Sequence, residues 1–268
     1  MNTEPLSNLH VERVRHPLAI RRLQVQRIDR ISPHFLRLRL HGPELAGFVS
    51  ASFDDHLKLM LPARPGVELV LPESGPDGPV LPPGAERPVM RDYTPRHFDS
   101  AAQTLDIECL MHQTGPATEW AARVRPGDPV GIGGPRGSFV VPLAFGCHVL
   151  IGDESAMPAI ARRLEALPGG TRAIVIVETR DPADRRAWAT RADLQAEWVQ
   201  AGTVDGLAKA VVAMALPAGV DTFAWAAGEA ATMVVVRQAL IDTHGLHKSR
   251  VRASAYWKRG SAGHHEAL

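Results

Sequence analysis

The chain has 268 residues and a mass of 29.0 kDa, with 45% hydrophobic and 22% charged residues and a formal net charge of +1. This is a globular mixture long enough for two domains, and the small net charge argues against nucleic-acid binding through bulk charge. Two cysteines, Cys109 and Cys147, are too few for a disulfide framework. With no signal-peptide or membrane-spanning pattern, a cytoplasmic protein is expected.

The first half of the chain alternates apolar and polar residues with the period of two that is typical of strands. The pattern covers residues 22–32, 34–41, 56–62 and 103–113. The segment from 62 to 88 is rich in proline and glycine, which predicts a loop with one short strand at 67–71. Many short strands with Gly/Pro turns predict a small antiparallel barrel or sandwich.

The segment RDYTPR at 91–96 follows this loop and brings two guanidinium groups, a phenol and a hydroxyl together. On an extended strand Arg91, Tyr93 and Pro95 would point to one face. A phenol ring and an arginine on one face suit a ligand that has a flat aromatic system and a phosphate. A solvated edge strand explains the same residues, and for Arg96 a surface or interdomain charge is the default expectation.

Residues 115–124 predict a short helix that Gly115 precedes and that carries Pro116 in its first turn. The free amides of that turn, with the hydroxyl of Thr118, suit a phosphate. Many helices begin in this way without any ligand, so this observation is not specific.

From about Phe145 the pattern changes to strands that alternate with helices. Strands are expected at 147–152, 172–179, 222–227 and 250–257, and helices at 153–170, 206–216 and 228–245. The alternation predicts a parallel sheet with helices on both faces and a domain boundary near 142–146.

Ligands bind such a sheet beyond the carboxyl ends of its strands, where the sequence places Asp153, Glu154, Ser155 and Glu229. The acidic residues are explained as helix caps, or they would face ribose hydroxyls. A G-x-G-x-x-G pattern is absent from the sequence, and no cluster of histidines or cysteines predicts a metal site.

Taken in order, these motifs resemble the siderophore-interacting proteins, which are FAD-dependent ferric-siderophore reductases of the ferredoxin-reductase-like superfamily. The matching pieces are FDDHLKLMLP, RDYTPR, HQTGPATEWAARVRPGDPVGIGGPRGSF, IGDESAMPAIARRLE, WAAGEAATMVVVRQAL and SAYWKRG. The resemblance implies a β + α/β fold. It consists of an antiparallel six-stranded flavin-binding β-barrel over residues 1–144 and an NAD(P)H-binding α/β parallel-sheet domain over residues 145–268, with a C-terminal extension on the siderophore side.

The resemblance also implies roles for single residues around FAD. Arg91 would pair with the pyrophosphate, Tyr93 would pack on the isoalloxazine, and Thr94 would hydrogen-bond the flavin ring. The other residues that it places at the cofactor are Gly115, Pro116, Ala117 and Thr118 at the helix start, and His56, Lys58 and His112 in the matching pieces.

At the nicotinamide nucleotide the resemblance places Asp153, Glu154 and Ser155. The sequence lacks the second glycine of the turn that broader relatives have there, so NADH, NADPH and another donor all stay possible. Residues 227–229 read Ala-Gly-Glu where many members of the superfamily have Cys-Gly-Pro, so a thiol is not expected at the nicotinamide.

The implied function is transfer of electrons from NAD(P)H through FAD to Fe(III) in a siderophore, with release of Fe(II). Lys58, Arg252 and Lys258 would form a cationic rim for an anionic ferric siderophore, or are ordinary surface charges. A flavodoxin or ferredoxin reductase and a non-catalytic siderophore-binding module are the alternatives. A monomer without a nucleic-acid or membrane partner is expected.

Overall fold

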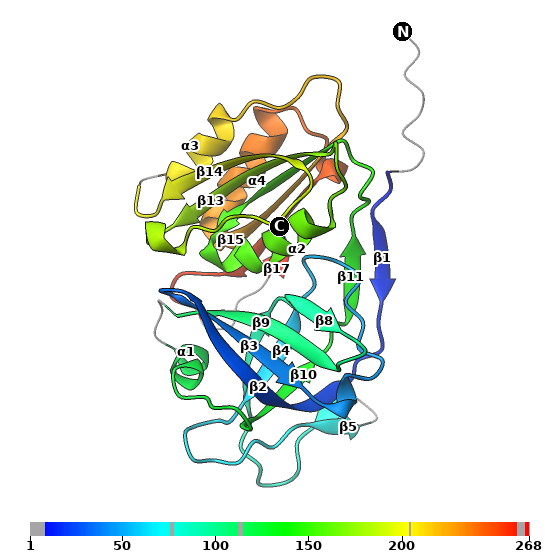
Figure 1. Ribbon diagram of the computed structural model, residues 1–268, viewed down its shortest axis with the longest axis vertical. Helices are drawn as coiled ribbons and strands as arrows, with labels where there is room; N and C mark the ends of the chain where they lie inside the picture. The colour runs from blue at the N-terminus through cyan, green and yellow to red at the C-terminus, as the bar shows by residue number, and fades with distance from the viewer. Residues whose placement is uncertain (1–8, 76–77, 112–114, 204, 262–265, 268) are drawn as a thin grey trace. The chain divides into compact units, whose positions relative to one another are not determined.

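The computed structural model describes residues 9–75, 78–111, 115–203, 205–261 and 266–267. It divides into two compact units (Figure 1). One unit is Arg13–Val140, and the other combines the described parts of Met1–Glu12 and Val141–Leu268. None of the helices in the described ranges is both long and apolar enough to cross a membrane.

The main sheet of the first unit is antiparallel and has the strand order β7-β4-β10-β2-β3-β9-β8 in the described residues. The strands are β2 (Ile20–Ser32), β3 (Phe35–His41), β4 (Leu57–Leu61), β7 (Val89–Tyr93), β8 (His97–Asp99), β9 (Thr104–Leu110) and β10 (Pro129–Gly133). The same unit holds the pairs β1 (Glu12–Arg15) with β11 (Gly137–Val140) and β5 (Glu73–Gly75) with β6 (Gly78–Val80), together with η1 (Pro43–Leu45) and α1 (Pro116–Ala121).

The two edge strands of this sheet, β7 and β8, follow each other in the chain and are joined by residues 94–96 alone. Such a link spans about 14 Å at most. The edges of a flat sheet with this number of strands would lie about 29 Å apart. The sheet therefore curls until its edges approach each other, as the expected barrel requires. The expected count of six strands becomes seven because the three-residue β8 joins the sheet.

The core of this unit lies on the inner face of the curled sheet, as the period-two pattern predicted. On β3 and β9 the register sets Leu38 opposite Ile107 and Leu36 opposite Cys109, and all four are buried. Residues 67–71 were expected to form a strand, which is wrong, because the structure has no strand there. Leu69 is buried without a strand partner, and its carbonyl accepts a hydrogen bond from Nη2 of Arg22 at 3.1 Å.

The second unit has a sheet of order β14-β13-β12-β15-β16-β17, in which the first five strands are parallel. The strands are β12 (Cys147–Asp153), β13 (Arg172–Thr179), β14 (Asp193–Gln200), β15 (Thr222–Glu229), β16 (Val251–Trp257) and β17 (Glu266–Ala267). The helices are α2 (Met157–Ala166), α3 (Gly206–Ala213) and α4 (Ala230–Asp242), with 3-10 turns η2 (Glu154–Ala156), η3 (Pro182–Asp184) and η4 (Lys248–Arg250).

Both faces of the parallel sheet are covered, as expected. Residues of α3 and α4, among them Val211 and Val236, share a core with Val149 and Ile174 of the strands. Side chains alternate along a strand, so Leu150 lies on the other face, where α2 packs on β12 and β13. Strand β14 was not expected, because an edge strand with mostly exposed residues has little apolar alternation.

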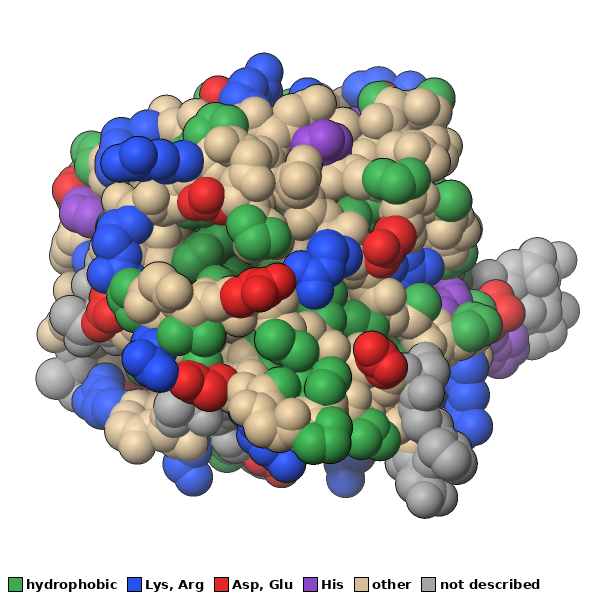
Figure 2. Space-filling view, turned by 90° about the horizontal axis from the view of Figure 1, so that it is seen from below, with side chains coloured by type: hydrophobic (Ala, Val, Ile, Leu, Met, Phe, Trp, Pro, Cys, Tyr) green, Lys and Arg blue, Asp and Glu red, His purple; other side chains and the backbone are tan. Residues whose placement is uncertain are grey.

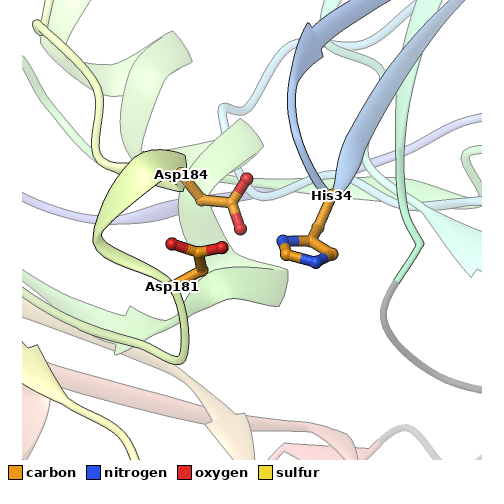
Figure 3. A group of neighbouring side chains, drawn as sticks. All are labelled: His34, Asp181 and Asp184. Carbon is orange, nitrogen blue, oxygen red and sulfur yellow. The ribbon is translucent and has the colours of Figure 1, made fainter.

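The surface shows no large region of one charge on the face drawn in Figure 2, as far as its described side chains go. Basic and acidic groups are interspersed there, which agrees with the net charge of +1. At η3, Asp181 caps the turn by accepting a hydrogen bond from the amide of Ala183 at 2.9 Å. Figure 3 shows its carboxylate next to that of Asp184, and it also draws His34 of the first unit. Helix capping explains the position of Asp181.

Candidate functional site

The segment 91–96, which the sequence predicts to contact a flavin, begins on the edge strand β7. The register with β4 sets Arg91 opposite Leu59 and Tyr93 opposite Leu57, so the two share the face that the core leucines occupy. In the described residues β4 is the only strand that pairs with β7. An edge strand offers free backbone groups along its other side. The arrangement suits a flat heteroaromatic ligand that has hydrogen-bonding edges.

Tyr93 is half-buried and packs against the core of the barrel. Its hydroxyl and the thiol of Cys109 on β9 form a hydrogen bond. Burial and the neighbouring Cys109 hold the pKa of Tyr93 well above its ordinary value, and burial raises the pKa of Cys109 to about 12. Both groups are therefore protonated at neutral pH, and the phenol is fixed by its hydroxyl end.

Arg91 donates a hydrogen bond from Nη1 to the carbonyl of its neighbour Met90 at 2.8 Å, and this contact is exposed. A guanidinium has five N–H donors, so most of them stay available to a ligand after this bond is made. Arg91 therefore provides an accessible cation on the same face as Tyr93.

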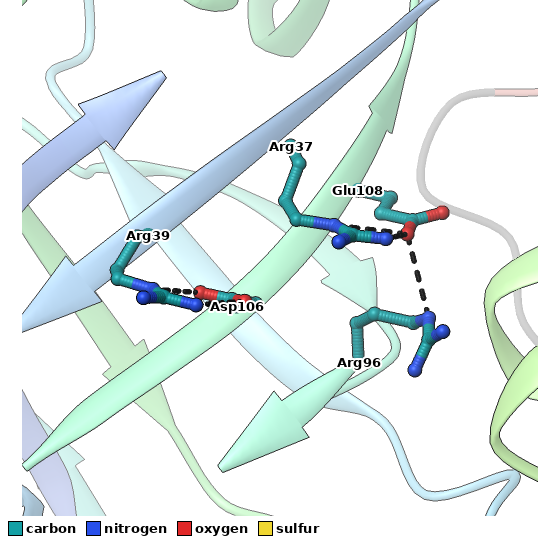
Figure 4. A network of polar contacts seen from close by, with 5 residues as sticks. All are labelled: Arg37, Arg39, Arg96, Asp106 and Glu108. Atoms are coloured by element: carbon teal, nitrogen blue, oxygen red, sulfur yellow. Dashed lines mark hydrogen bonds and ion pairs between the residues drawn. The ribbon is translucent and has the colours of Figure 1, made fainter. Parts of the chain in front are cut away.

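Residues 94–96 leave the strand geometry because β7 ends at Tyr93. Thr94 is buried. Arg96 is not the surface charge that was expected, since its side chain is only 11% exposed and its Nε lies 3.4 Å from Oε1 of Glu108 (Figure 4). Glu108 is completely buried on β9 and draws the guanidinium inward, which a reading of the segment alone could not show.

The predicted helix start is present as α1, with Gly115 as its N-cap and Pro116 as its first residue. The helix contacts β7, the strand that carries Arg91 and Tyr93, and it also contacts β9. Ala117 is buried in the barrel core and anchors the turn, and Thr118 is half-buried. The amides of a first helical turn have no acceptor within their own helix. His112 lies outside the described residues.

Lys58 and His56 lie at the start of β4, but Lys58 points away from the face of Arg91 and Tyr93. The register sets Lys58 opposite Asp92, and its Nζ lies 2.8 Å from Oδ2 of that residue. The side chain of Lys58 is 48% exposed, and that of Asp92 is largely buried. Lys58 is thus engaged in an ion pair on the outer face, while His56 is exposed.

In the second unit, the strand order changes direction between β12 and β15, and their carboxyl ends meet at Asp153 and Glu229. A crevice at such a point is where open parallel sheets bind nucleotides. Both residues cap the helical turns that follow. Asp153 accepts a hydrogen bond from the amide of Ser155 at 2.9 Å, and Glu229 accepts one from the amide of Thr232 at 3.0 Å.

Asp153 joins three segments at this point. Its Oδ1 also accepts a hydrogen bond from the hydroxyl of Ser155, while its Oδ2 accepts from the amide of Glu229 at 3.0 Å and from Nε1 of Trp257 at 2.8 Å. A side chain on Gly228 would approach Oδ2 to 2.6 Å, so the carboxylate needs glycine there. Burial raises the pKa of Asp153.

Glu154 is also committed within the protein. It is buried, and its Oε1 accepts hydrogen bonds from the amide of Arg180 at 2.7 Å and from the hydroxyl of Thr179 at 3.1 Å. The contact ties the end of β12 to that of β13. The carboxyl group of Glu178 is near both of these acids. Its pKa is raised, first by burial and then by the negative charges of Asp153 and Glu154. The carboxyl edge of the sheet is therefore acidic here.

Asp153→Ala is expected to lower the free energy of unfolding by about 2 to 3 kcal/mol, because the N–H donors of Ser155, Glu229 and Trp257 lose their acceptor. Urea denaturation monitored by tryptophan fluorescence measures the change. Ser155→Ala is the control, since it removes one hydroxyl and should cost less than about 1 kcal/mol. Equal losses in the two variants would contradict the joining role of Asp153.

The two cations predicted in the C-terminal segment lie at opposite ends of β16. Arg252 is the second residue of the strand and pairs with the buried Trp225, whereas Lys258 is exposed just beyond the strand's end. Six residues of extended chain separate the two Cα atoms by about 20 Å. Only Lys258 is near the carboxyl ends of the strands, so the structure does not bring this pair together.

Three residues with contacts to the predicted site were absent from the sequence prediction. They are Cys109, Glu108 and Trp257, which hold Tyr93, Arg96 and Asp153 respectively. The alternation of β9 predicted that Glu108 and Cys109 face opposite sides. Their partners come from distant parts of the chain, so spacing gave no signal for the contacts.

Known proteins match both halves of the chain. Residues 24–139 match the family model described as siderophore-interacting FAD-binding domain, and residues 145–260 match the one described as siderophore-interacting protein. An NADPH-dependent ferric-chelate reductase of Escherichia coli is 37% identical, over 96% of this chain and 99% of the relative. The ferric vibriobactin reductase ViuB of Vibrio cholerae is 31% identical, over 86% of each chain.

A solved structure also matches almost the whole chain. It is the crystal structure of a siderophore utilization protein from T. fusca, with a TM-score of 0.86 and 34% sequence identity. The match covers 94% of this chain and 98% of that one. The similarity therefore extends over both units and is not limited to one domain.

Proposed function

Because this chain belongs to the siderophore-interacting protein family, we propose that it is an FAD-dependent ferric-siderophore reductase that takes electrons from NAD(P)H. The relative from Escherichia coli, named as an NADPH-dependent ferric-chelate reductase, supports both the reaction and NADPH as donor. In this proposal residues 1–144 bind FAD and residues 145–268 bind the nicotinamide nucleotide, with the end of the chain on the siderophore side.

The observation that carries the proposal is the register of β7, which gives Arg91 and Tyr93 one common face at an edge of the barrel. The residues fit FAD on three counts. A half-buried phenol fixed by Cys109 can pack on the isoalloxazine, and the free donors of Arg91 can pair with the pyrophosphate. Helix α1 contacts β7, and the amides of its first turn could bind the same phosphates.

Other predicted residues take supporting roles around FAD. Thr94 would hydrogen-bond the flavin ring, and Gly115, Pro116, Ala117 and Thr118 would form the phosphate-binding turn. A flavin accepts electrons in pairs and releases them singly, which suits Fe(III) as acceptor. The protein's own contribution is to bind and orient the reactants, since Fe(III) stays within its chelator as substrate.

For the nicotinamide nucleotide we propose a site at the carboxyl ends of β12 and β15. Ser155 would face the nucleotide, while Asp153 and Glu154 would support the site from within, because their carboxylates already accept hydrogen bonds from the protein. Without a glycine-rich phosphate turn, we expect the ribose hydroxyls to contribute much of the recognition.

The proposal includes a monomeric, cytoplasmic protein. Both cysteines are free and buried, which agrees with a reducing compartment. Light scattering coupled to size-exclusion chromatography would test the monomer, and a mass of two chains would contradict it. Cell fractionation would test the compartment.

The function is tested by purifying the full chain and recording its absorbance, which should show bound flavin. The protein is then mixed without oxygen with NADPH or NADH, a ferric hydroxamate chelate and a chromogenic Fe(II) chelator. Appearance of the Fe(II) complex with either donor supports the reductase. A colourless protein that cannot take up FAD would instead favour a siderophore-binding module.

Lys258→Ala is expected to leave the FAD content unchanged and to raise KM for an anionic ferric chelate several-fold, because it removes an exposed cation near the carboxyl ends of the strands. Steady-state kinetics at low ionic strength measures the effect. Lys248→Ala is the matched control, since it removes an exposed lysine in η4, just before the opposite end of β16. Equal KM changes in the two variants would contradict the role of Lys258.

A further inference from the structure

Two adjacent residues of β9 contact the segment 91–96 from opposite faces of the sheet. Cys109 lies on the inner face, within the barrel core. Glu108 lies on the outer face, opposite Arg37 of β3. Cys109 contacts Tyr93 and Glu108 contacts Arg96. These two adjacent residues therefore contact both ends of the segment 93–96.

The outer contact is an ion-pair network, drawn in Figure 4. Oε1 of Glu108 accepts hydrogen bonds from Arg37, from Nη2 at 2.7 Å and from Nε at 3.3 Å, and it lies 3.4 Å from Nε of Arg96. The backbone amide of Arg96 also donates to the carbonyl of Asp106 at 2.8 Å. Both the backbone and the side chain of Arg96 are thus tied to β9.

The burial of Glu108 is energetically demanding, because a carboxylate with no exposed surface loses its hydration. The neighbouring pair on the same face of β3 and β9 has a similar ion pair. There Arg39 and Asp106 form two hydrogen bonds, at 2.7 and 2.8 Å. That pair has the same chemistry on the same two strands, but among the described residues its side chains form no hydrogen bond or ion pair with residues 93–96. Comparing variants of the two pairs therefore distinguishes a general stabilising role from a role at residues 93–96.

The inner contact fixes the phenol of Tyr93. Its hydroxyl is hydrogen-bonded to the Cys109 thiol, inside the core that Leu57 and Ile107 also line. This hydrogen bond restrains the rotation of the phenol ring. Burial of the pair in apolar surroundings makes this hydrogen bond stronger than it would be in water.

We propose that Glu108 and Cys109 are positioning residues for FAD: they hold Tyr93, Thr94 and the following turn in the flavin-binding arrangement before the cofactor binds. The inference rests on the proposed function, because it takes residues 91–94 as the flavin contact. Preorganisation of this kind increases affinity by removing the ordering cost from the binding step.

The test uses full-length apoprotein prepared by removing the flavin. FAD is titrated into the parent and into the variants Glu108→Gln, Asp106→Asn, Cys109→Ala and Cys109→Ser, and quenching of flavin fluorescence gives Kd. Urea denaturation of each apoprotein, measured without FAD, gives stability separately. Asp106→Asn is the matched control for Glu108→Gln, because both remove one charge from the same face of β9.

We expect Glu108→Gln to raise Kd for FAD about tenfold, as for residues that orient ligand-binding groups elsewhere, and Asp106→Asn to change it less than about twofold. Cys109→Ala should also weaken binding, and Cys109→Ser should restore it, because serine keeps a hydrogen-bonding group for Tyr93. Loss of apoprotein stability should be similar in the two charge variants.

Equal Kd values for Glu108→Gln and Asp106→Asn would overturn the role of Glu108. If Glu108→Gln does not fold, the cysteine variants decide, and equal affinities of Cys109→Ala and Cys109→Ser would overturn the inference. A parent protein that binds no FAD would overturn the proposed function itself, and so is distinguishable from a failure of the positioning role alone.

Discussion

Arg91→Ala is expected to weaken FAD binding about a hundredfold, so that the purified variant has lost most of its flavin. A guanidinium that pairs with a pyrophosphate makes charge-assisted hydrogen bonds, each of about 1.5 to 3 kcal/mol. Loss of about 2.7 kcal/mol corresponds to a hundredfold change in Kd. Flavin content per protein from the absorbance spectrum, together with titration of the apoprotein, measures the effect.

Arg64→Ala is a suitable control for this variant. Arg64 belongs to the same unit and is exposed in an ion pair with Glu86 at 2.6 Å, so its loss should leave the flavin in place. Arg91→Lys should give an intermediate affinity, because lysine keeps the charge but lacks the planar fork. Flavin content of Arg91→Ala equal to that of the parent would contradict the assignment of Arg91 and weaken the whole flavin site.

The second large effect is expected at low pH and originates at His148. This residue is 1% exposed at the start of β12, where its ring packs edge-on against Phe145 and Nη2 of Arg163 lies 3.4 Å from its Nδ1. Burial, reinforced by the charge of Arg163, lowers the pKa of His148 from 6.5 to about 3. The imidazole is thus neutral in the folded protein at every pH above that value.

The direction of the pH effect follows from where the proton is bound. Between pH 6.5 and about 3 the unfolded chain protonates this histidine while the folded chain does not. The free energy of unfolding therefore falls as the pH falls through this window. Above pH 6.5 His148 is neutral in both the folded and the unfolded chain, so no stability is lost there. The lowering of the pKa from 6.5 to about 3 sets an upper limit of about 5 kcal/mol for the total loss of stability.

Urea denaturation from pH 7 to pH 3.5 of the parent and of His148→Gln measures this contribution as a difference. The stability of the parent should fall more steeply than that of the variant, which has no imidazole to protonate at this position. His97→Gln, which removes an exposed histidine, is the matched control. Parallel curves for the parent and His148→Gln would show that this histidine does not destabilise the fold in acid.

Local periodicity was sufficient to predict most elements of this fold. Alternating apolar residues on β3 and β9, and the change near Phe145 to strands and helices in alternation, predicted the faces of the barrel strands and the parallel sheet. It failed at two places. Strand β14 is mostly exposed, and Leu69 is buried in a segment that is not a strand.

The candidate site was predicted only as far as neighbouring residues determine it. Arg91 and Tyr93 share a face because side chains on a strand alternate, and Pro116 starts α1 because proline is tolerated in a first turn. The predicted strand at 250–257 already placed Arg252 near its start and Lys258 just beyond its end. The sequence could not show that Lys58 is paired with Asp92, because that contact depends on the register between β4 and β7.

The alternation of residues 91–96 and the chemistry of their side chains follow from the sequence alone. The contacts that hold the segment in place are visible only in the tertiary structure. They come from β9, which is brought beside the segment by strand pairing that no local sequence pattern encodes. Buried Glu108 pairs with Arg96, whose side chain is only 11% exposed, and Cys109 in the core fixes the hydroxyl of Tyr93. Side-chain chemistry is a property of the sequence, whereas desolvation and partnership arise only when distant strands come together.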